Sequence, residues 1–205
     1  MRRGCPPLSP DSAPWQPLSI GPSPSAPISS ALINNYLGNR YRNNWIHFTN
    51  LGNWGDNVLD RASLTELIQF GNGIATAAYY HAFRGQAGVL LDGSQAGGYV
   101  LTFPASVIPE ASRLWLLTAY TPNSVEMILN LINKYVVAGY PPGLVRNRDG
   151  SISIHIARVR PPGVPEANWL PVGFRPFNVM LRLYLVVPGS AAANNTYVPP
   201  PVVPR

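Results

Sequence analysis

Apolar and polar residues alternate along six segments after residue 77, which is the pattern of β-strands with one buried face. These segments are 78–84, 98–103, 113–120, 135–137, 151–157 and 177–187. The alternation is clearest in 151–157, where Ile152, Ile154 and Ile156 share one side and His155 lies on the other. Six short strands without alternating helices are not typical of a parallel α/β fold. They predict a mainly β, antiparallel fold of the β-sandwich or jelly-roll type.

Helical periodicity is confined to the segment before these strands, so we expect a short helical N-terminal lead-in. A helix is predicted from Asn57 to a stop at Gly71-Asn72-Gly73. Its apolar residues fall broadly on one face: Val58, Leu59, Ala62, Leu67 and Ile68. A shorter helix is expected after Ser29 or Ser30, ending near Tyr41. Residues 123–134 fit either a helix or a loop across the mouth of a barrel.

Proline and serine separate the chain into three parts. Residues 1–27 are rich in both and are expected to be disordered, while residues 28–188 form the β-domain. Residues 189–205 predict an extended, proline-rich tail, with Tyr197 and Val198 as the residues through which it could lie along the domain.

Composition narrows the functional classes. Charged residues make up 12% of the 205, and 14 of the 15 basic ones are arginines, with Lys134 the remaining one. The arginines are scattered and do not interleave with aromatic residues, so a nucleic-acid role is not predicted. No apolar run approaches the ~20 residues of a membrane span, nor is there a recognisable signal peptide, and the localisation is left open. The single cysteine, Cys5, excludes a disulfide scaffold.

Several separated motifs between residues 52 and 200 resemble one protein family. Among them are Gly-Asn-Trp-Gly at 52–55, Leu-Asp-Gly-Ser at 91–94, Tyr-Val-Leu-Thr-Phe-Pro at 99–104, Asn-Arg-Asp-Gly-Ser-Ile at 147–152, Asn-Trp-Leu-Pro at 168–171 and Leu-Arg-Leu-Tyr at 181–184. In this order they resemble the domain-of-unknown-function family 1214. The chain departs from the family pattern at Leu116, Thr121 and Val172-Gly173.

The resemblance implies a jelly-roll-like β-fold without an established activity. Relatives commonly carry an upstream partner, the domain-of-unknown-function family 1254, and bacterial relatives are often exported. Residues 1–51 are too short and too proline-rich to hold that partner, so it would be a separate partner of this chain.

The strongest polar cluster is predicted on the last strand, where Arg182 and Tyr184 alternate with leucines. A partly covered arginine requires a carboxylate, backbone carbonyls or a ligand. The proposed ligand-binding set is Arg182, Tyr184, Tyr120, Tyr99, Trp115, Asn168 and Trp169. The alternative is a structural arginine paired with Asp92, Asp149 or Glu166, with Trp169 buried in the core.

Catalytic and metal motifs are not evident. The histidines His47, His81 and His155 lack metal-ligand spacing, and no Gly-x-Ser-x-Gly motif is present. We therefore predict neither a metal nor a cofactor, and expect His155 to be exposed or hydrogen-bonded.

The leading hypothesis is binding of a small polar, anionic or sugar-like ligand. Two alternatives stay open: a hydrolase or lyase acting on such a ligand, and a structural module that forms homo-oligomers.

Overall fold

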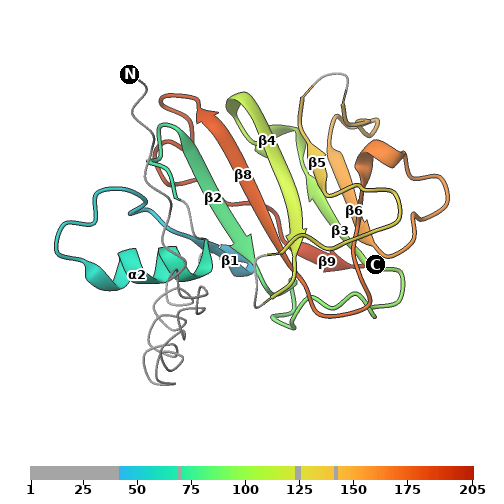
Figure 1. The fold of residues 1–205 in the computed structure, drawn as a ribbon. Coiled ribbons are helices and arrows are strands. Elements are labelled where there is room, and N and C mark those ends of the chain that lie inside the picture. Colours follow the sequence, from blue (N-terminus) through green and yellow to red (C-terminus); the bar gives the residue numbers. More distant parts are fainter. Residues whose placement is uncertain (1–41, 69–70, 123–125, 141–142) are drawn as a thin grey trace, which may run out of the picture.

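The computed structural model describes residues 42–68, 71–122, 126–140 and 143–205. The helix expected after Ser29 or Ser30 and the tail expected over 1–27 lie outside these residues. The part described is mainly β, with two sheets and the α-helix α2 (Figure 1).

The first sheet has five strands in the order β1-β2-β8-β4-β5. Their bounds are β1 Trp45–His47, β2 Ala77–Ala82, β8 Asn178–Val186, β4 Ala111–Tyr120 and β5 Val136–Ala138. The second sheet has four strands in the order β7-β6-β3-β9. Their bounds are β7 Trp169–Pro171, β6 Ile152–Ala157, β3 Tyr99–Phe103 and β9 Val202–Pro204. All pairings are antiparallel except that of β6 with β7.

The remaining elements are helical. Helix α2 spans Val58–Leu67, and three short 3₁₀ helices are η1 Arg42–Asn44, η2 Ala105–Val107 and η3 Glu166–Asn168. Residues 126–134 form no helix, so the loop alternative holds for the described part of 123–134.

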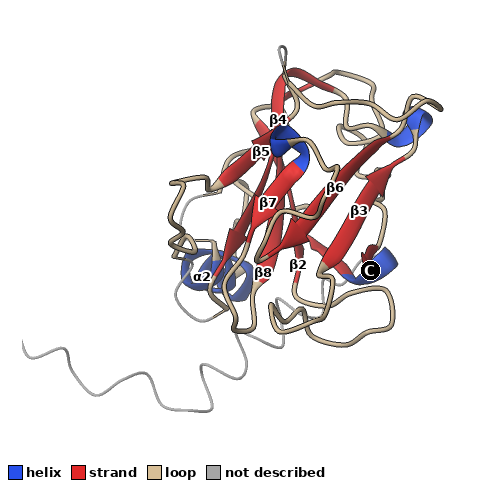
Figure 2. Ribbon diagram, turned by 90° about the vertical axis from the view of Figure 1, so that its right-hand side faces the viewer, coloured by secondary structure: helices blue, strands red, loops and turns tan. Residues whose placement is uncertain are grey.

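All six predicted strands are present, as β2, β3, β4, β5, β6 and β8. The alternation predicted them because each has one face in a common core. Leu101 of β3, Ile154 of β6 and Leu181 of β8 are completely buried in the same cluster, which side chains of both sheets share. Figure 2 shows β3, β6 and β7 in front of β2 and β8, as two layers.

Helix α2 covers the opposite face of the first sheet. Its N-terminus is capped by the side chain of Asn57, which accepts a hydrogen bond from the Asp60 amide. Leu64 and Ile68 are buried against Tyr79 and Met180 of the sheet. The helix was predicted correctly, but the face was wrong in part, because Val58 is 64% exposed and Leu59 and Ala62 are exposed too.

The C-terminal segment lies on the domain and contributes a strand. Strand β9 pairs with β3, Val202 is completely buried, and the Tyr197 hydroxyl donates a hydrogen bond to the carbonyl of Val107. The carbonyls of Pro199 and Pro200 accept hydrogen bonds from the side chains of Asn43 and Trp45. Residues beyond Tyr197 and Val198 thus take part in the second sheet, which local sequence did not predict.

Candidate functional site

The structure divides the seven predicted site residues among three places. Arg182, Tyr184 and Tyr120 lie together on the outer face of the first sheet, beneath helix α2. Tyr99 and Trp115 lie in the core between the sheets. Asn168 and Trp169 lie at the β7 edge of the second sheet. One pocket containing all seven residues is therefore not formed.

The outer-face group is centred on Arg182. In the sheet register Arg182 pairs with Tyr79 of β2 on one side and Leu116 of β4 on the other. Its guanidinium carbon lies 5.2 Å from the centre of the Tyr120 ring, within the range of a cation–π contact. Three tyrosines, Tyr79, Tyr120 and Tyr184, therefore share a face with one partly buried arginine, and we call these four residues the Arg182 cluster.

Next to this cluster lies His81, a buried histidine on the same face. Its Nε2 is hydrogen-bonded to Oδ1 of Asn178 at 2.6 Å. The pKa of His81 is lowered to about 4, because burial lowers it more than the hydrogen bond to Asn178 raises it, and Arg182 adds a smaller lowering. The imidazole is therefore neutral at pH 7, and the positive charge of this group belongs to Arg182.

The Tyr184 hydroxyl remains protonated at neutral pH. Burial raises the pKa of Tyr184 above its ordinary value, neighbouring Tyr79 and Tyr120 raise it as well, and Arg182 opposes this shift. Tyr184 can therefore donate a hydrogen bond to a ligand oxygen beside a permanent cation.

The structural alternative for Arg182 required a carboxylate partner. Among the described residues Arg182 has neither an ion-pair nor a hydrogen-bond partner, its contact being the Tyr120 ring. Asp92 accepts a hydrogen bond from the Ser94 amide, and Asp149 accepts two from Ser151, both within turns. Glu166 lies in η3, near Lys134 rather than Arg182.

Tyr99 and Trp115 are buried parts of the core. The Tyr99 hydroxyl accepts a hydrogen bond from the Asp92 amide, and its ring meets Phe177 edge-on with centroids 5.8 Å apart. Trp115 is 3% exposed and its ring centre lies 5.2 Å from that of Phe103. Neither side chain faces the Arg182 cluster, because both alternate to the inner side of their strands.

Asn168 holds two loops to the second sheet. Its side-chain oxygen accepts from the Val145 amide, while Nδ2 donates to the carbonyls of Val145 and Ser153 at 2.9 and 3.0 Å. The indole N–H of the neighbouring Trp169, which is partly buried, donates to the Ala157 carbonyl. Through these hydrogen bonds Asn168 and Trp169 stabilise the β7 edge of the second sheet.

The Asn168→Ala variant is expected to lower the free energy of unfolding by about 2–3 kcal/mol. The substitution removes the three hydrogen bonds of the buried Asn168 side chain to the backbone of Val145 and Ser153, each worth about 0.5–1.5 kcal/mol. Urea denaturation measures the effect. The control Asn194→Ala removes an exposed asparagine and should change the free energy of unfolding by less than ~0.5 kcal/mol. Equal effects of the two variants would contradict a structural role for the hydrogen bonds of Asn168.

The sequence did not predict that Tyr79 and His81 lie beside Arg182. A signal was present, since both alternate with Ala78 and Tyr80 on a predicted strand. Their meeting with Arg182 depends on the pairing of β2 with β8, residues about 100 positions apart, which local patterns do not encode.

Histidines and acidic residues are the candidate metal ligands in the described part of the chain. There, no group of three or more histidine, cysteine, aspartate or glutamate side chains is arranged to hold a metal ion. His155 was expected to be exposed or hydrogen-bonded, yet it is partly buried, and its Nδ1 has neither exposure nor a hydrogen bond. No helix in residues 42–68, 71–122, 126–140 or 143–205 is long and apolar enough to span a membrane.

Two solved structures are similar to this fold. The VPA0106 protein of Vibrio parahaemolyticus matches with a TM-score of 0.58 and 26% identity, over 71% of this chain and 34% of that one. An uncharacterized protein of Burkholderia cenocepacia matches with a TM-score of 0.41 and 20% identity, over 71% of this chain and 32% of that one. The chain thus spans about a third of the length of these proteins. No curated protein matches it significantly.

A family model matches residues 76–187, which include β2, β3, β4, β5, β6, β7 and β8 and the residues of the Arg182 cluster. The model is described as a protein of unknown function, DUF1214. This agrees with the resemblance found in the motifs of the sequence, and the chain belongs to the DUF1214 family.

Proposed function

We propose that this chain binds a small polar or anionic ligand at the Arg182 cluster. The observation that carries the proposal is a partly buried guanidinium that, among the described residues, has no carboxylate to neutralise it. Burying a charge without a partner is costly, so such a group is retained where a ligand supplies the partner.

The chemistry of the cluster suggests the ligand class. A guanidinium presents several N–H donors in one plane and binds carboxylate or phosphate oxygens in pairs. The hydroxyl of Tyr184 adds a neutral donor, and the Tyr120 ring adds an apolar surface beside the cation. Oxygen-rich anions with a ring or short carbon skeleton, such as a sugar acid, fit these groups.

A ligand panel with the Arg182→Gln variant tests this proposal. Glucuronate and glucose form a matched pair that differs by a carboxylate, and citrate and inorganic phosphate extend the panel. We expect glucuronate or another anion to raise the unfolding temperature, since a ligand at 100 times its Kd stabilises the native state by ~2.7 kcal/mol. In Arg182→Gln this stabilisation should fall to about half or less, because loss of a charged hydrogen bond weakens binding by about tenfold or more.

Arg113→Gln is the control for this experiment. Arg113 lies on neighbouring strand β4 and is exposed, so its loss changes the net charge equally without touching the cluster. Arg113→Gln should bind as the unchanged protein does. The proposal would be wrong if no anion stabilised the protein, or if Arg182→Gln responded as fully as Arg113→Gln.

Other roles stay predictions. Hydrolase or lyase chemistry on the same ligand, assembly into homo-oligomers, and an upstream partner of the domain-of-unknown-function family 1254 are untested by these contacts. The shared core of the two sheets supports a β-sandwich arrangement, which we also propose in its jelly-roll form.

A further inference from the structure

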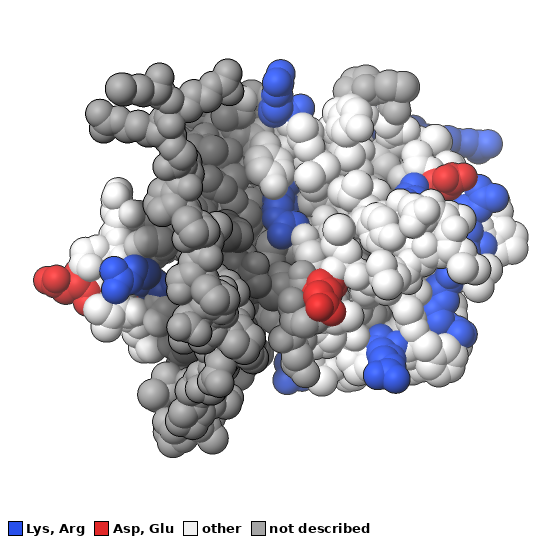
Figure 3. All heavy atoms as spheres, in the orientation of Figure 1, with Lys and Arg blue, Asp and Glu red and all other residues white. Residues whose placement is uncertain are grey.

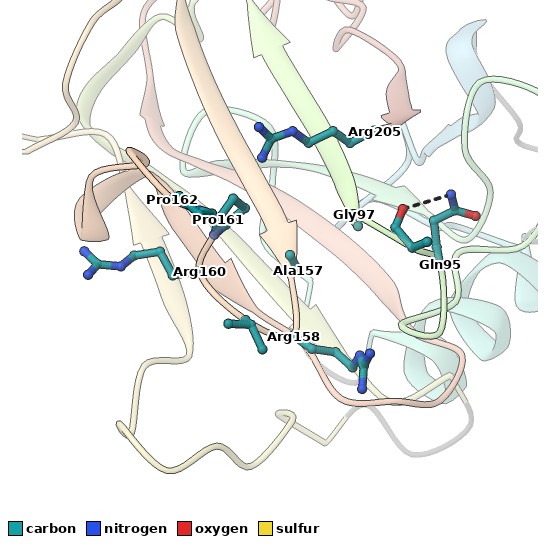
Figure 4. Close-up of a pocket in the computed structure, with 11 residues that line it drawn as sticks. Gln95, Gly97, Ala157, Arg158, Arg160, Pro161, Pro162 and Arg205 are labelled. Carbon is teal, nitrogen blue, oxygen red and sulfur yellow. Dashed lines mark hydrogen bonds between the residues drawn. The ribbon is translucent and has the colours of Figure 1, made fainter.

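A second basic site lies at the end of β6, on the sheet away from the Arg182 cluster. It is a cavity of about 410 Å³ between the loop before β3, the segment that follows β6, and the residue after β9 (Figure 4). A volume of this size is typical of sites for metabolite-sized molecules. The cavity lies where neighbouring strand ends meet. Gly98 precedes β3, Ala157 ends β6 and Arg205 follows β9, and both β6 and β9 pair with β3.

Three arginines line this cavity: Arg158, Arg160 and Arg205. All three are exposed, and no acidic side chain is among the described residues that line it. The Arg158 guanidinium lies 4.2 Å from the centre of the Phe174 ring, which holds it by a cation–π contact. We call these three residues the arginine rim.

Two arginines of the rim act on neighbouring basic groups. Burial, with Arg205 contributing, lowers the pKa of His155, while burial and Arg160 lower that of Lys134, which Glu166 partly opposes. Glu166 is an acidic group close to Lys134. In Figure 3 the half of the molecule away from α2 carries more basic than acidic side chains, so an approaching anion meets a positive surface.

Part of the cavity lining is apolar. Ala96, Val159, Pro161 and Pro162 supply its apolar surface. Gly98 has a φ of 71°, and a Cβ there would lie 2.4 Å from the Ile156 carbonyl oxygen. A glycine is therefore required for the backbone to approach β6 and leave the hollow open beside it.

The directions of the side chains indicate the shape of a ligand. In Figure 4 the side chains of Arg160 and Arg205 extend toward the left of the view and that of Arg158 toward the right, so the three guanidinium groups lie apart around the Ala157 and Pro161-Pro162 surface. Guanidinium groups that extend to different sides favour a ligand with more than one anionic group. A larger molecule with anionic groups at separate ends could reach two of them while its carbon skeleton covers the prolines.

We propose that the arginine rim binds an organic polyanion of metabolite size, one with two or more carboxylate or phosphate groups. The ligand lies over the apolar part of the lining, and Arg158 and Arg205 hold its anionic groups from two sides. This site is separate from the Arg182 cluster, since it lies at the end of the second sheet.

Calorimetric titration of the full chain tests the proposal with named probes. Fructose 1,6-bisphosphate and citrate carry several anionic groups, fructose 6-phosphate carries one phosphate group, and fructose carries none. We expect at least one of the two polyanions to bind, and to bind more tightly than fructose 6-phosphate. The double variant Arg158→Gln/Arg205→Gln should raise its Kd by tenfold or more, and 0.5 M salt should weaken it further through screening.

Matched variants separate this site from others. Arg113→Gln removes an exposed arginine outside the cavity, and Arg182→Gln removes the guanidinium of the other candidate site; both should keep the Kd of the unchanged protein. The proposal is overturned if neither polyanion binds, if the double variant binds as well as Arg113→Gln, or if binding is lost in Arg182→Gln alone. In that last case the Arg182 cluster would be the anion site.

Discussion

The Trp115→Ala variant is expected to lose about 3–5 kcal/mol of unfolding free energy, the range for deleting a large buried aromatic side chain. Trp115 is 3% exposed and packs on Phe103 of the second sheet. The fit is tight on its other side, because a Cβ on Gly139 would lie 2.1 Å from the indole ring. The surrounding side chains therefore cannot collapse into the space without moving the backbone of β4 or β5. Urea denaturation followed by circular dichroism measures the loss.

This variant also distinguishes a core residue from a ligand contact. If Trp115 belonged to a binding pocket, its removal would abolish ligand protection at a cost below ~1 kcal/mol. We expect the reverse: a large loss of stability, with the Kd of any anion at the Arg182 cluster unchanged in the folded fraction. Tyr140→Ala is the control, because Tyr140 is an aromatic residue that is 53% exposed and should change stability by less than ~0.5 kcal/mol.

The second large effect is expected from the segment that contains β9. Truncation after Val198 should destabilise the protein by about 2.5–6 kcal/mol or prevent folding. It removes completely buried Val202, worth about 1.5–3 kcal/mol. It also removes the Pro200 carbonyl that accepts the Trp45 indole N–H at 2.7 Å, so a buried donor loses its partner at a cost of about 1–3 kcal/mol.

A point variant keeps this prediction testable if the truncated chain does not fold. Val202→Asp places a carboxylate in the core, whereas Val203→Asp places it on the exposed side of the same strand, where the side chain is 36% exposed. Thermal unfolding should show a large decrease in Tm for Val202→Asp and a small one for Val203→Asp. Equal, small decreases would mean that residues 199–205 are a tail without a structural role.

Both candidate sites lie outside the core, on opposite sheets, and both depend on arginine. They differ in how the guanidinium is held. Arg182 is partly buried among tyrosines in the middle of a sheet, which favours a small ligand and strict geometry. Arg158, Arg160 and Arg205 are exposed at strand ends, which favours a larger, more hydrated polyanion and a strong dependence on salt.

Much of the fold was predictable because the strands that bury one face carry that face in their sequence. The sequence alternates Ile152, Ile154 and Ile156 with Ser153 and His155. In the structure the three isoleucines are buried in the core between the two sheets. Strands β1, β7 and β9 were missed because β1 is buried along its whole length and shows no alternation, and because β7 and β9 each end in a proline. The face of α2 was predicted in part, because Val58 and Leu59 are apolar yet exposed at the start of the helix.

The candidate site was predictable only where one strand contained it. Arg182 and Tyr184 were grouped correctly because alternate residues of a strand lie on one face. The sequence alone could not separate Tyr99 and Trp115 from them, since an aromatic residue on a strand suits either a core or a pocket. Nor could it show that the Asn168 amide is used by backbone groups of Val145 and Ser153.

By itself the sequence determined the local properties of this protein: which segments are strands, which face of each is apolar, and which motifs place it in its family. These depend on residues that are neighbours along the chain. Only the tertiary structure decided which strands pair, and therefore that Tyr79 lies beside Arg182 and that Arg205 lies near Arg158. Those contacts join residues about 50 to 100 positions apart, and they form because burying the two apolar faces together selects one register among many.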